Sequence, residues 1–197
     1  MRANNVLGII HSQAFDSTIQ ELTTMRTFAS VPFGCRYRFV DFPLSNMVNA
    51  GVTEVGIITK ENYQSLMDHI GSGKDWDMSK KNGGLRLLPP FNYQKEWGIM
   101  PFRGKIEALA GVRSYLENIR QDYVVLMDGD LVVNLPLKDV LEQHISTGAD
   151  ITVVCGNDSF RTDNGSYFEK DDSGKVTDVL YQVSTPRGYR GLDVYIL

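Results

Sequence analysis

The stretch from Tyr123 to Cys155 reads YVVLMDGDLVVNLPLKDVLEQHISTGADITVVC and predicts a strand, a helix and a second strand. The runs Tyr123–Met127 and Ile151–Cys155 are nearly continuous in apolar residues, as expected of strands that are covered on both faces. Between them, Pro136–Ile145 places apolar residues at helical spacing, and Gly148 provides a stop signal. Strands that alternate with helices in this way favour a largely parallel sheet with helices on both faces.

The same alternation extends over the rest of the chain. Further elements are predicted as strands at Val6–Ile10 and Val55–Thr59 and as helices at Asp41–Ala50, Glu61–Ile70 and Lys105–Ile119. Ser166–Glu169 and Val176–Gln182 flank the turn-forming residues DDSG and predict a β-hairpin. Between Ile70 and Gly104, repeated glycines and prolines predict a long loop. The predicted fold class is therefore α/β and Rossmann-like, with a mostly parallel sheet and a β-hairpin late in the chain.

Composition and charge argue against several classes of protein. The 197 residues, 42% hydrophobic and 22% charged, are ordinary for a globular domain. A net charge of −4 argues against a nucleic-acid partner, which normally requires a clustered basic surface. No apolar run approaches the roughly 18–20 residues that span a bilayer, and the first residues lack a signal-peptide pattern. We therefore expect a cytoplasmic protein with neither a nucleic-acid nor a membrane partner, in which Cys35 and Cys155 are reduced.

Two carboxylates follow the predicted strand Tyr123–Met127. Ligands of open α/β sheets bind outside the carboxyl ends of the strands, so Asp128 and Asp130 lie where a nucleotide would bind. Two carboxylates around Gly129 can hold a divalent cation while a phosphate supplies further oxygens. The same triplet can also be a turn whose aspartates cap the next helix. From these residues alone, both interpretations stay open.

The segment VPFGCRYRFVDFPLSN, residues Val31 to Asn46, resembles VPFGGKYRIIDFPLSN, which is characteristic of ADP-glucose pyrophosphorylases. The resemblance continues in colinear order through VNAGVTEVGIIT, HIGSGKDW, LLPP, the helix start at Gly104 and YVVLMDGD. It implies a family that joins ATP and glucose 1-phosphate into ADP-glucose and pyrophosphate with the help of Mg²⁺. It further implies that Asp130 is the catalytic and metal-binding aspartate and that Gly104 and Gly129 belong to the nucleotide site. A second metal-binding carboxylate is expected beyond Leu197.

The triphosphate loop of this family is altered in the chain. Family members carry GGxGxRL after the first strand and RAKP a little later, and these segments hold the triphosphate through backbone N–H groups and cationic side chains. The corresponding loop residues here are His11, Ser12, Gln13, Ala14, Phe15 and Asp16. Thr18 replaces the arginine, and Phe28 replaces the lysine. A carboxylate about 4 Å from a phosphate charge costs about 4 kcal/mol at an effective dielectric constant of roughly 20, so ordinary triphosphate binding at this loop is not expected.

This altered loop resembles that of the GlgD-type subunit, which some bacteria have beside a conventional catalytic subunit. The resemblance implies a regulatory, non-catalytic or weakly catalytic subunit of glucose-1-phosphate adenylyltransferase in glycogen synthesis. The implied partner is a catalytic ADP-glucose pyrophosphorylase subunit in a hetero- or homo-oligomer, and the family substrates are ATP and glucose 1-phosphate. Two alternatives stay open: an active nucleotidyltransferase with a non-standard ATP site, and a module that senses a sugar phosphate.

Three cationic side chains have two interpretations each. Arg36 and Arg38, with Asp41, form either an ion-paired knot that supports their loop or a site for an anionic effector such as a sugar phosphate. Lys105 is either a charge that compensates for the altered loop or a surface lysine at the start of a helix.

The chain stops at Val194–Leu197, an apolar run that resembles a buried strand. A buried strand is an unusual place for a natural terminus. We therefore expect residues 1–197 to be the N-terminal part of a nucleotidyltransferase-like catalytic domain that is truncated before its end.

Overall fold

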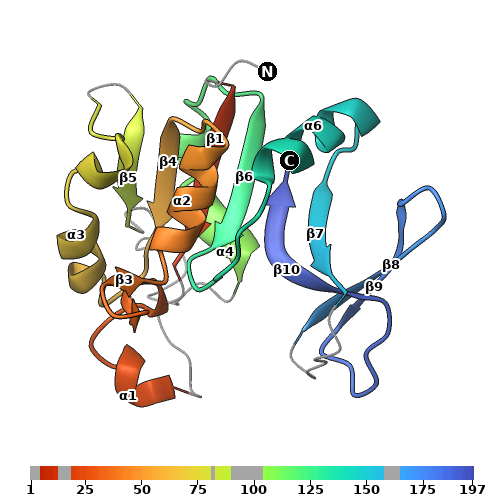
Figure 1. The fold of residues 1–197 in the computed structure, drawn as a ribbon, viewed down its shortest axis with the longest axis horizontal. Helices are drawn as coiled ribbons and strands as arrows, with labels where there is room; N and C mark the ends of the chain where they lie inside the picture. The colour runs from red at the N-terminus through yellow and green to blue at the C-terminus, as the bar shows by residue number, and fades with distance from the viewer. Residues whose placement is uncertain (1–4, 13–18, 81–82, 90–103, 158–164) are drawn as a thin grey trace.

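The computed structural model describes residues 5–12, 19–80, 83–89, 104–157 and 165–197. Their central feature is an eight-stranded sheet in the order β5-β4-β1-β6-β10-β8-β9, with β7 paired to β10 outside this path (Figure 1). Four neighbouring strands run parallel, namely β5 (Gly84–Leu88), β4 (Glu54–Ile58), β1 (Val6–His11) and β6 (Tyr123–Asp128). The predicted Rossmann-like α/β fold is confirmed.

The sheet continues beyond β6 with antiparallel strands. β10 (Tyr189–Ile196) runs antiparallel to β6, and both β7 (Thr152–Gly156) and β8 (Ser166–Lys170) run antiparallel to β10. β8 pairs with β9 (Val176–Tyr181), so the predicted late hairpin is confirmed. The predicted strand near Ile151–Cys155 is also present, but β10 separates it from β6. Residues far along the chain make this insertion, so the local strand–helix–strand pattern could not indicate it.

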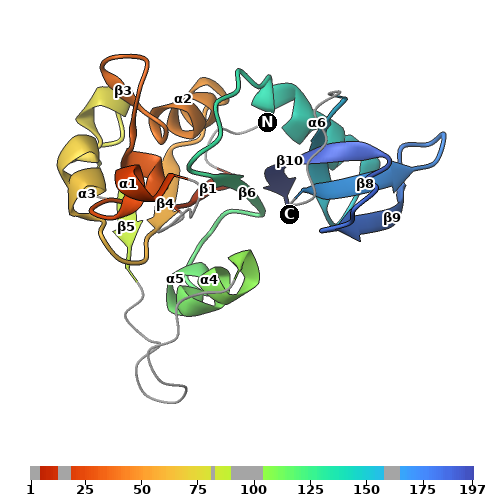
Figure 2. The same cartoon turned by 90° about the horizontal axis from the view of Figure 1, so that it is seen from below.

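Helices cover both faces of the parallel strands (Figures 1 and 2). The helices concerned are α2 (Asp41–Asn49) and α6 (Leu137–Thr147) on one face and α4 (Lys105–Gly111) and α5 (Arg113–Leu116) on the other. Along β1, Val6 and Ile10 pack into the core below α2 and α6, while Leu7 and Ile9 pack toward α4. Successive side chains of a strand point to opposite faces, so burial of both faces requires the continuous apolar run seen in the sequence.

The prediction of one long helix at Lys105–Ile119 is wrong in one respect, because two short helices occupy this region. α4 ends at Gly111 and α5 begins at Arg113, with Val112 at φ −111° and ψ 19° between them. Glycine and β-branched valine are both weak helix formers, and here they stand side by side. The break leaves Val112 buried against the sheet.

The predicted loop between Ile70 and Gly104 is also partly wrong. β5 lies within it and pairs with β4 in parallel, and a short 3₁₀ helix, η3 (Lys74–Trp76), precedes it. β5 carries an exposed arginine, Arg86, and forms the edge of the sheet, so it lacks the continuous apolar pattern of a central strand. Residues 90–103 lie outside the described residues.

The first part of the segment VPFGCRYRFVDFPLSN forms a small two-stranded sheet outside the main sheet. β2 (Pro32–Phe33) and β3 (Tyr37–Arg38) pair antiparallel, and α3 (Gln64–Ile70) and the 3₁₀ helix η2 (Phe28–Ser30) lie nearby. A short helix, α1 (Gln20–Thr23), precedes η2. Within the described ranges, no helix combines the length and the hydropathy needed to cross a membrane.

Candidate functional site

The carboxyl ends of β1, β4 and β6 bring several buried polar groups to one edge of the sheet. His11 ends β1, Ser12 follows it, Thr59 follows β4, and Asp128 ends β6. Ser12, Thr59 and Asp128 are at most 2% exposed. Among the described residues, His11 Nδ1, Ser12 Oγ, Thr59 Oγ1 and Asp128 Oδ1 have no hydrogen-bond partner. Since an unpaired buried polar group is costly, this edge is chemically suited to a polar ligand.

Lys105 connects this edge to the neighbouring antiparallel strand. Its ammonium lies 3.0 Å from Asp128 Oδ2 and 2.7 Å from Asp193 Oδ1, and so forms two ion pairs at once. The Asp128 side chain is 3% exposed, whereas those of Lys105 and Asp193 are 25% and 45% exposed. Lys105 is therefore not the free surface lysine of one interpretation, but a partly buried cation shared by two strands.

Asp193 reaches Lys105 because of an irregularity in β10. The register of β10 against β7 shifts between Gly191 and Val194, and Asp193 within this shift has φ 55°. A bulge of this kind re-aims side chains, and a non-glycine residue in this conformation is uncommon. Asp193 could not be recognised from the sequence, because a lone aspartate in an apolar run carries no motif.

The electrostatics of the edge keep Lys105 charged. Burial acts to lower the pKa of Lys105, but the carboxylates of Asp128 and Asp193 outweigh it and hold the pKa well above its ordinary value. Burial, followed by the charge of Asp128, raises the pKa of Asp130 to about 6. Asp130, half-buried in the turn after β6, is therefore protonated more readily than an ordinary aspartate.

Gly129 lies where the backbone turns tightly after β6. Its N–H donates a hydrogen bond to the carbonyl of His11 at 2.9 Å, and a Cβ added to it would lie 2.8 Å from Ala29 Cβ. Gly129 thus allows close approach between the end of β6 and η2. Gly104 is different, since an added Cβ would meet nothing within 4 Å and its φ of −170° is open to any residue.

This contrast predicts that Gly129→Ala lowers the free energy of unfolding by about 1–3 kcal/mol, the usual cost of overpacking. Gly104→Ala should cost only about 0.5 kcal/mol, because alanine is a poorer N-cap than glycine but fits the space. Urea denaturation of both variants checks this. Equal effects would contradict the close approach of Gly129 to Ala29.

The Arg38 guanidinium is held by backbone and side-chain oxygens. Its Nη1 donates to the carbonyl of Ser30 at 3.1 Å, to the carbonyl of Ser65 at 2.9 Å and to the Ser65 hydroxyl. Asp41 accepts the backbone N–H of Arg38 at Oδ2, and its Oδ1 lies 2.6 Å from His69 Nε2. Within the described chain no ion pair joins the side chains of Arg38 and Asp41. This segment is instead stabilised by the hydrogen bonds of Arg38 and by the contact between Asp41 and His69.

Arg36 remains accessible at the tip of the β2–β3 turn. Its guanidinium lies 5.2 Å from the centre of the Tyr37 ring, and the residue is exposed. Binding of an anion by Arg36 stays a prediction. The loop positions Gln13, Ala14, Phe15 and Asp16 lie outside the described residues, so of the altered triphosphate loop the structure describes only His11 and Ser12.

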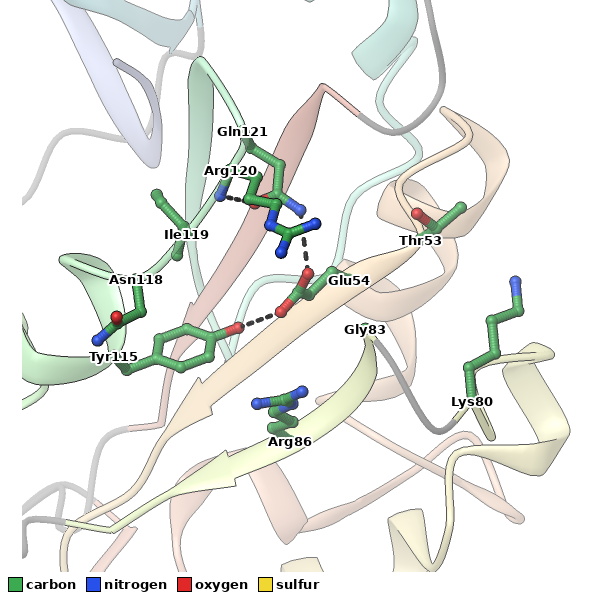
Figure 3. A pocket seen from close by; sticks show the side chains of 10 residues that line it. All are labelled: Thr53, Glu54, Lys80, Gly83, Arg86, Tyr115, Asn118, Ile119, Arg120 and Gln121. Carbon is green, nitrogen blue, oxygen red and sulfur yellow. Dashed lines mark hydrogen bonds between the residues drawn. The ribbon is translucent and has the colours of Figure 1, made fainter.

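A cavity of about 590 Å³ lies at the other end of these strands, near the amino ends of β4 and β6 (Figure 3). Glu54 accepts hydrogen bonds there from Tyr115 Oη at 3.1 Å and Gln121 Nε2 at 3.0 Å. Three cationic residues, Lys80, Arg86 and Arg120, also line the cavity. This cavity has no signature in the sequence, because its residues come from separate segments and share no motif.

Comparison with known proteins agrees with this fold. Residues 17–180 match the protein family described as nucleotidyl transferase. Glycogen biosynthesis protein GlgD from Bacillus subtilis is 36% identical over 151 residues, which cover 77% of this chain and 43% of that protein. Glucose-1-phosphate adenylyltransferase from Geobacillus stearothermophilus is 37% identical over 139 residues, which cover 70% of this chain and 35% of that protein. The chain therefore spans about two fifths of the length of these relatives.

A solved structure shares the fold at lower identity. A Bacillus anthracis protein assigned as a glucose-1-phosphate thymidylyltransferase, crystallised with sucrose, superposes with a TM-score of 0.74. The match covers 97% of this chain and 70% of that one at 17% identity. At this identity the likeness supports the architecture alone.

Proposed function

Because this chain belongs to the nucleotidyl transferase family, we propose that it is part of a non-catalytic subunit of glucose-1-phosphate adenylyltransferase that acts in bacterial glycogen synthesis. The relatives named GlgD and glucose-1-phosphate adenylyltransferase support the family reaction, which is the joining of ATP and glucose 1-phosphate. The subunit would assemble in the cytoplasm with a catalytic ADP-glucose pyrophosphorylase subunit and leave turnover to it.

The observation that carries this proposal is the occupation of the carboxylate edge by Lys105. Asp130, which matches the metal-binding aspartate of the family, lies beside Asp128 in the turn after β6. Asp128 and Asp193 are both ion-paired to Lys105. The loss of the glycine-rich triphosphate loop from the sequence acts in the same direction. A site without the loop that binds the triphosphate, and with the Lys105 ammonium between its carboxylates, is poorly suited to turnover.

The family cofactor Mg²⁺ does not fit between Asp128 and Asp193, the two carboxylates at this edge that Lys105 contacts. Mg²⁺ is usually bound through one or two carboxylates together with water and phosphate oxygens. Here one oxygen of Asp128 and one of Asp193 already contact an ammonium. In the part of the chain that the structure describes, no three His, Cys, Asp or Glu side chains are grouped to hold a metal ion. In this proposal Asp130, which matches the metal-binding aspartate of the family, is a vestige of the catalytic site.

The role of this subunit would be to support and regulate its partner. In the family reaction, glucose 1-phosphate attacks the α-phosphate of ATP, which requires that both substrates be held in line. With its altered loop, this chain would contribute contacts and effector sensitivity rather than this alignment. Arg36 is exposed at the tip of its turn, where among the described residues its guanidinium donates a hydrogen bond only to the exposed Tyr37 hydroxyl, so an anionic effector can reach it more readily than it can reach Arg38.

The test is the formation of ADP-glucose by the purified protein, alone and mixed with a catalytic subunit from the same organism. Alone, we expect turnover far below about 1 s⁻¹, the low end of ordinary enzyme rates. In the mixture, the rate or the effector response of the partner should change, and an equal amount of an unrelated protein serves as the control. Turnover of the protein alone at an ordinary rate would overturn the proposal.

A sensing module is a second candidate, and the cavity of Figure 3 is the observation that favours it. Three cations beside a cavity of about 590 Å³ suit a small anionic ligand. Calorimetry separates this candidate from a nucleotide-binding subunit. A pure sensor should release or absorb heat with sugar phosphates and show no response to Mg-ATP.

A further inference from the structure

The ammonium of Lys105 lies between the carboxylates of Asp128 and Asp193, at the position where these two side chains would bind a cation. β6 and β10 are neighbours, with Val194 opposite Met127, so Asp128 and Asp193 come next to each other at one end of this pairing. Two carboxylates in such a position create a strongly negative potential between them. The Lys105 ammonium fills this position and contacts one oxygen of each carboxylate.

The position of α4 against the sheet determines where the Lys105 ammonium lies. Lys105 is the first residue of α4, which packs on the β1–β6 sheet through Ala108. The centre of the Tyr195 ring lies 5.9 Å from Nζ, and the Tyr195 hydroxyl donates a hydrogen bond to Asp193 Oδ1 at 3.4 Å. The cation is thus fixed by packing of the helix as well as by its two ion pairs, and it does not dissociate as a bound ion would.

Asp128 requires a cation in this position. Its side chain is 3% exposed, and an ionised carboxylate buried to this degree is costly without a compensating charge. Its second oxygen, Oδ1, lies 3.6 Å from His11 Nδ1, and neither atom has a hydrogen-bond partner among the described residues. Asp128 therefore keeps an unused oxygen that a metal ion could bind if the ammonium were absent.

We propose that Lys105 is a built-in cation that takes the place of a divalent metal ion between Asp128 and Asp193, so that the wild-type protein binds neither Mg²⁺ nor Mn²⁺ there. Removal of the ammonium, with both carboxylates left in place, should open the position to a divalent ion. This inference concerns metal binding alone and does not depend on the protein being a non-catalytic subunit.

The test measures free Mn²⁺ by electron paramagnetic resonance while Mn²⁺ is added to wild-type, Lys105→Gln and Lys138→Gln proteins. Lys138 is an exposed lysine on α6 and provides the matched loss of charge. Lys105→Gln should gain one Mn²⁺ site, at least about 10-fold tighter than any residual Mn²⁺ binding by the wild type, since the competing ammonium is gone. Lys138→Gln should behave as the wild type does. The gain should disappear in Lys105→Gln/Asp193→Asn.

Thermal unfolding with and without Mn²⁺ guards against a variant that folds poorly. A ligand that binds only the folded state stabilises it by mass action, so Mn²⁺ should raise the Tm of both Lys105→Gln and Lys105→Met. Two results would overturn the inference. One is wild-type Mn²⁺ binding that Asp193→Asn abolishes, and the other is a folded Lys105→Gln that gains no Mn²⁺. No nucleotide or partner is present, so either result leaves the proposed function to be judged by its own assay.

Discussion

Lys105→Met is expected to lower the free energy of unfolding by about 2–4 kcal/mol, near the lower end of the range for breaking a buried ion pair. Methionine keeps most of the apolar stem but removes the charge that compensates Asp128, which is 3% exposed. Asp193 contributes less to this loss, because it is 45% exposed and water can solvate it. Chemical denaturation in the absence of metal ions measures the change.

Two further variants isolate the ion pair. Lys138→Met removes a lysine whose partner, Glu142, is 4.0 Å away on the surface, and it should change stability by no more than about 0.5 kcal/mol. Lys105→Met/Asp128→Asn should recover part of the loss, since asparagine needs no counter-charge. If Lys105→Met costs no more than Lys138→Met, the buried ion pair is not a stabilising contact.

The sequence predicts the parallel centre of the sheet well because burial on both faces leaves a strong signal. Three of the four apolar runs correspond to the buried strands β1, β4 and β6, and the fourth corresponds to β7, whose residues are half-buried. The prediction fails where a strand is an edge, as with β5 and its exposed Arg86, or where pairing is non-local, as with β10 between β6 and β7. Edge exposure weakens the apolar pattern, and insertion of a later strand has no local signature.

The candidate site could be located from the sequence but not assembled from it. The residues from Asp128 to Asp130 lie at the carboxyl end of a buried strand, so their place follows from the general rule for α/β sheets. The ion pairs of Lys105 do not follow from any such rule. Lys105 and Asp193 are 88 positions apart, and they meet only through a bulge in β10. The three contacts of Arg38 likewise involve Ser30 and Ser65, which belong to no common motif.

Arg38→Met is expected to lower the free energy of unfolding by about 2–3 kcal/mol, because hydrogen bonds to a charged group are stronger than those between neutral groups. The three contacts of Arg38 share one nitrogen, so their contributions do not simply add. The guanidinium joins the carbonyl of Ser30, which is fully buried, to the carbonyl and hydroxyl of Ser65 just inside α3. Its removal leaves the Ser30 carbonyl without this donor and removes the hydrogen bonds through which Arg38 links η2 to α3. Urea denaturation should show a lower midpoint with an unchanged slope.

Arg36→Met is the matched control for Arg38→Met, since both are arginines of the β2–β3 hairpin and only Arg36 is exposed. Arg36→Met should change stability by no more than about 0.5 kcal/mol, as is usual for surface substitutions. Sugar-phosphate binding, measured by calorimetry, should respond in the opposite way, with affinity lost in Arg36→Met and kept in a folded Arg38→Met. If Arg38→Met instead loses anion affinity while its stability is unchanged, then its guanidinium serves a ligand and not the contact between η2 and α3.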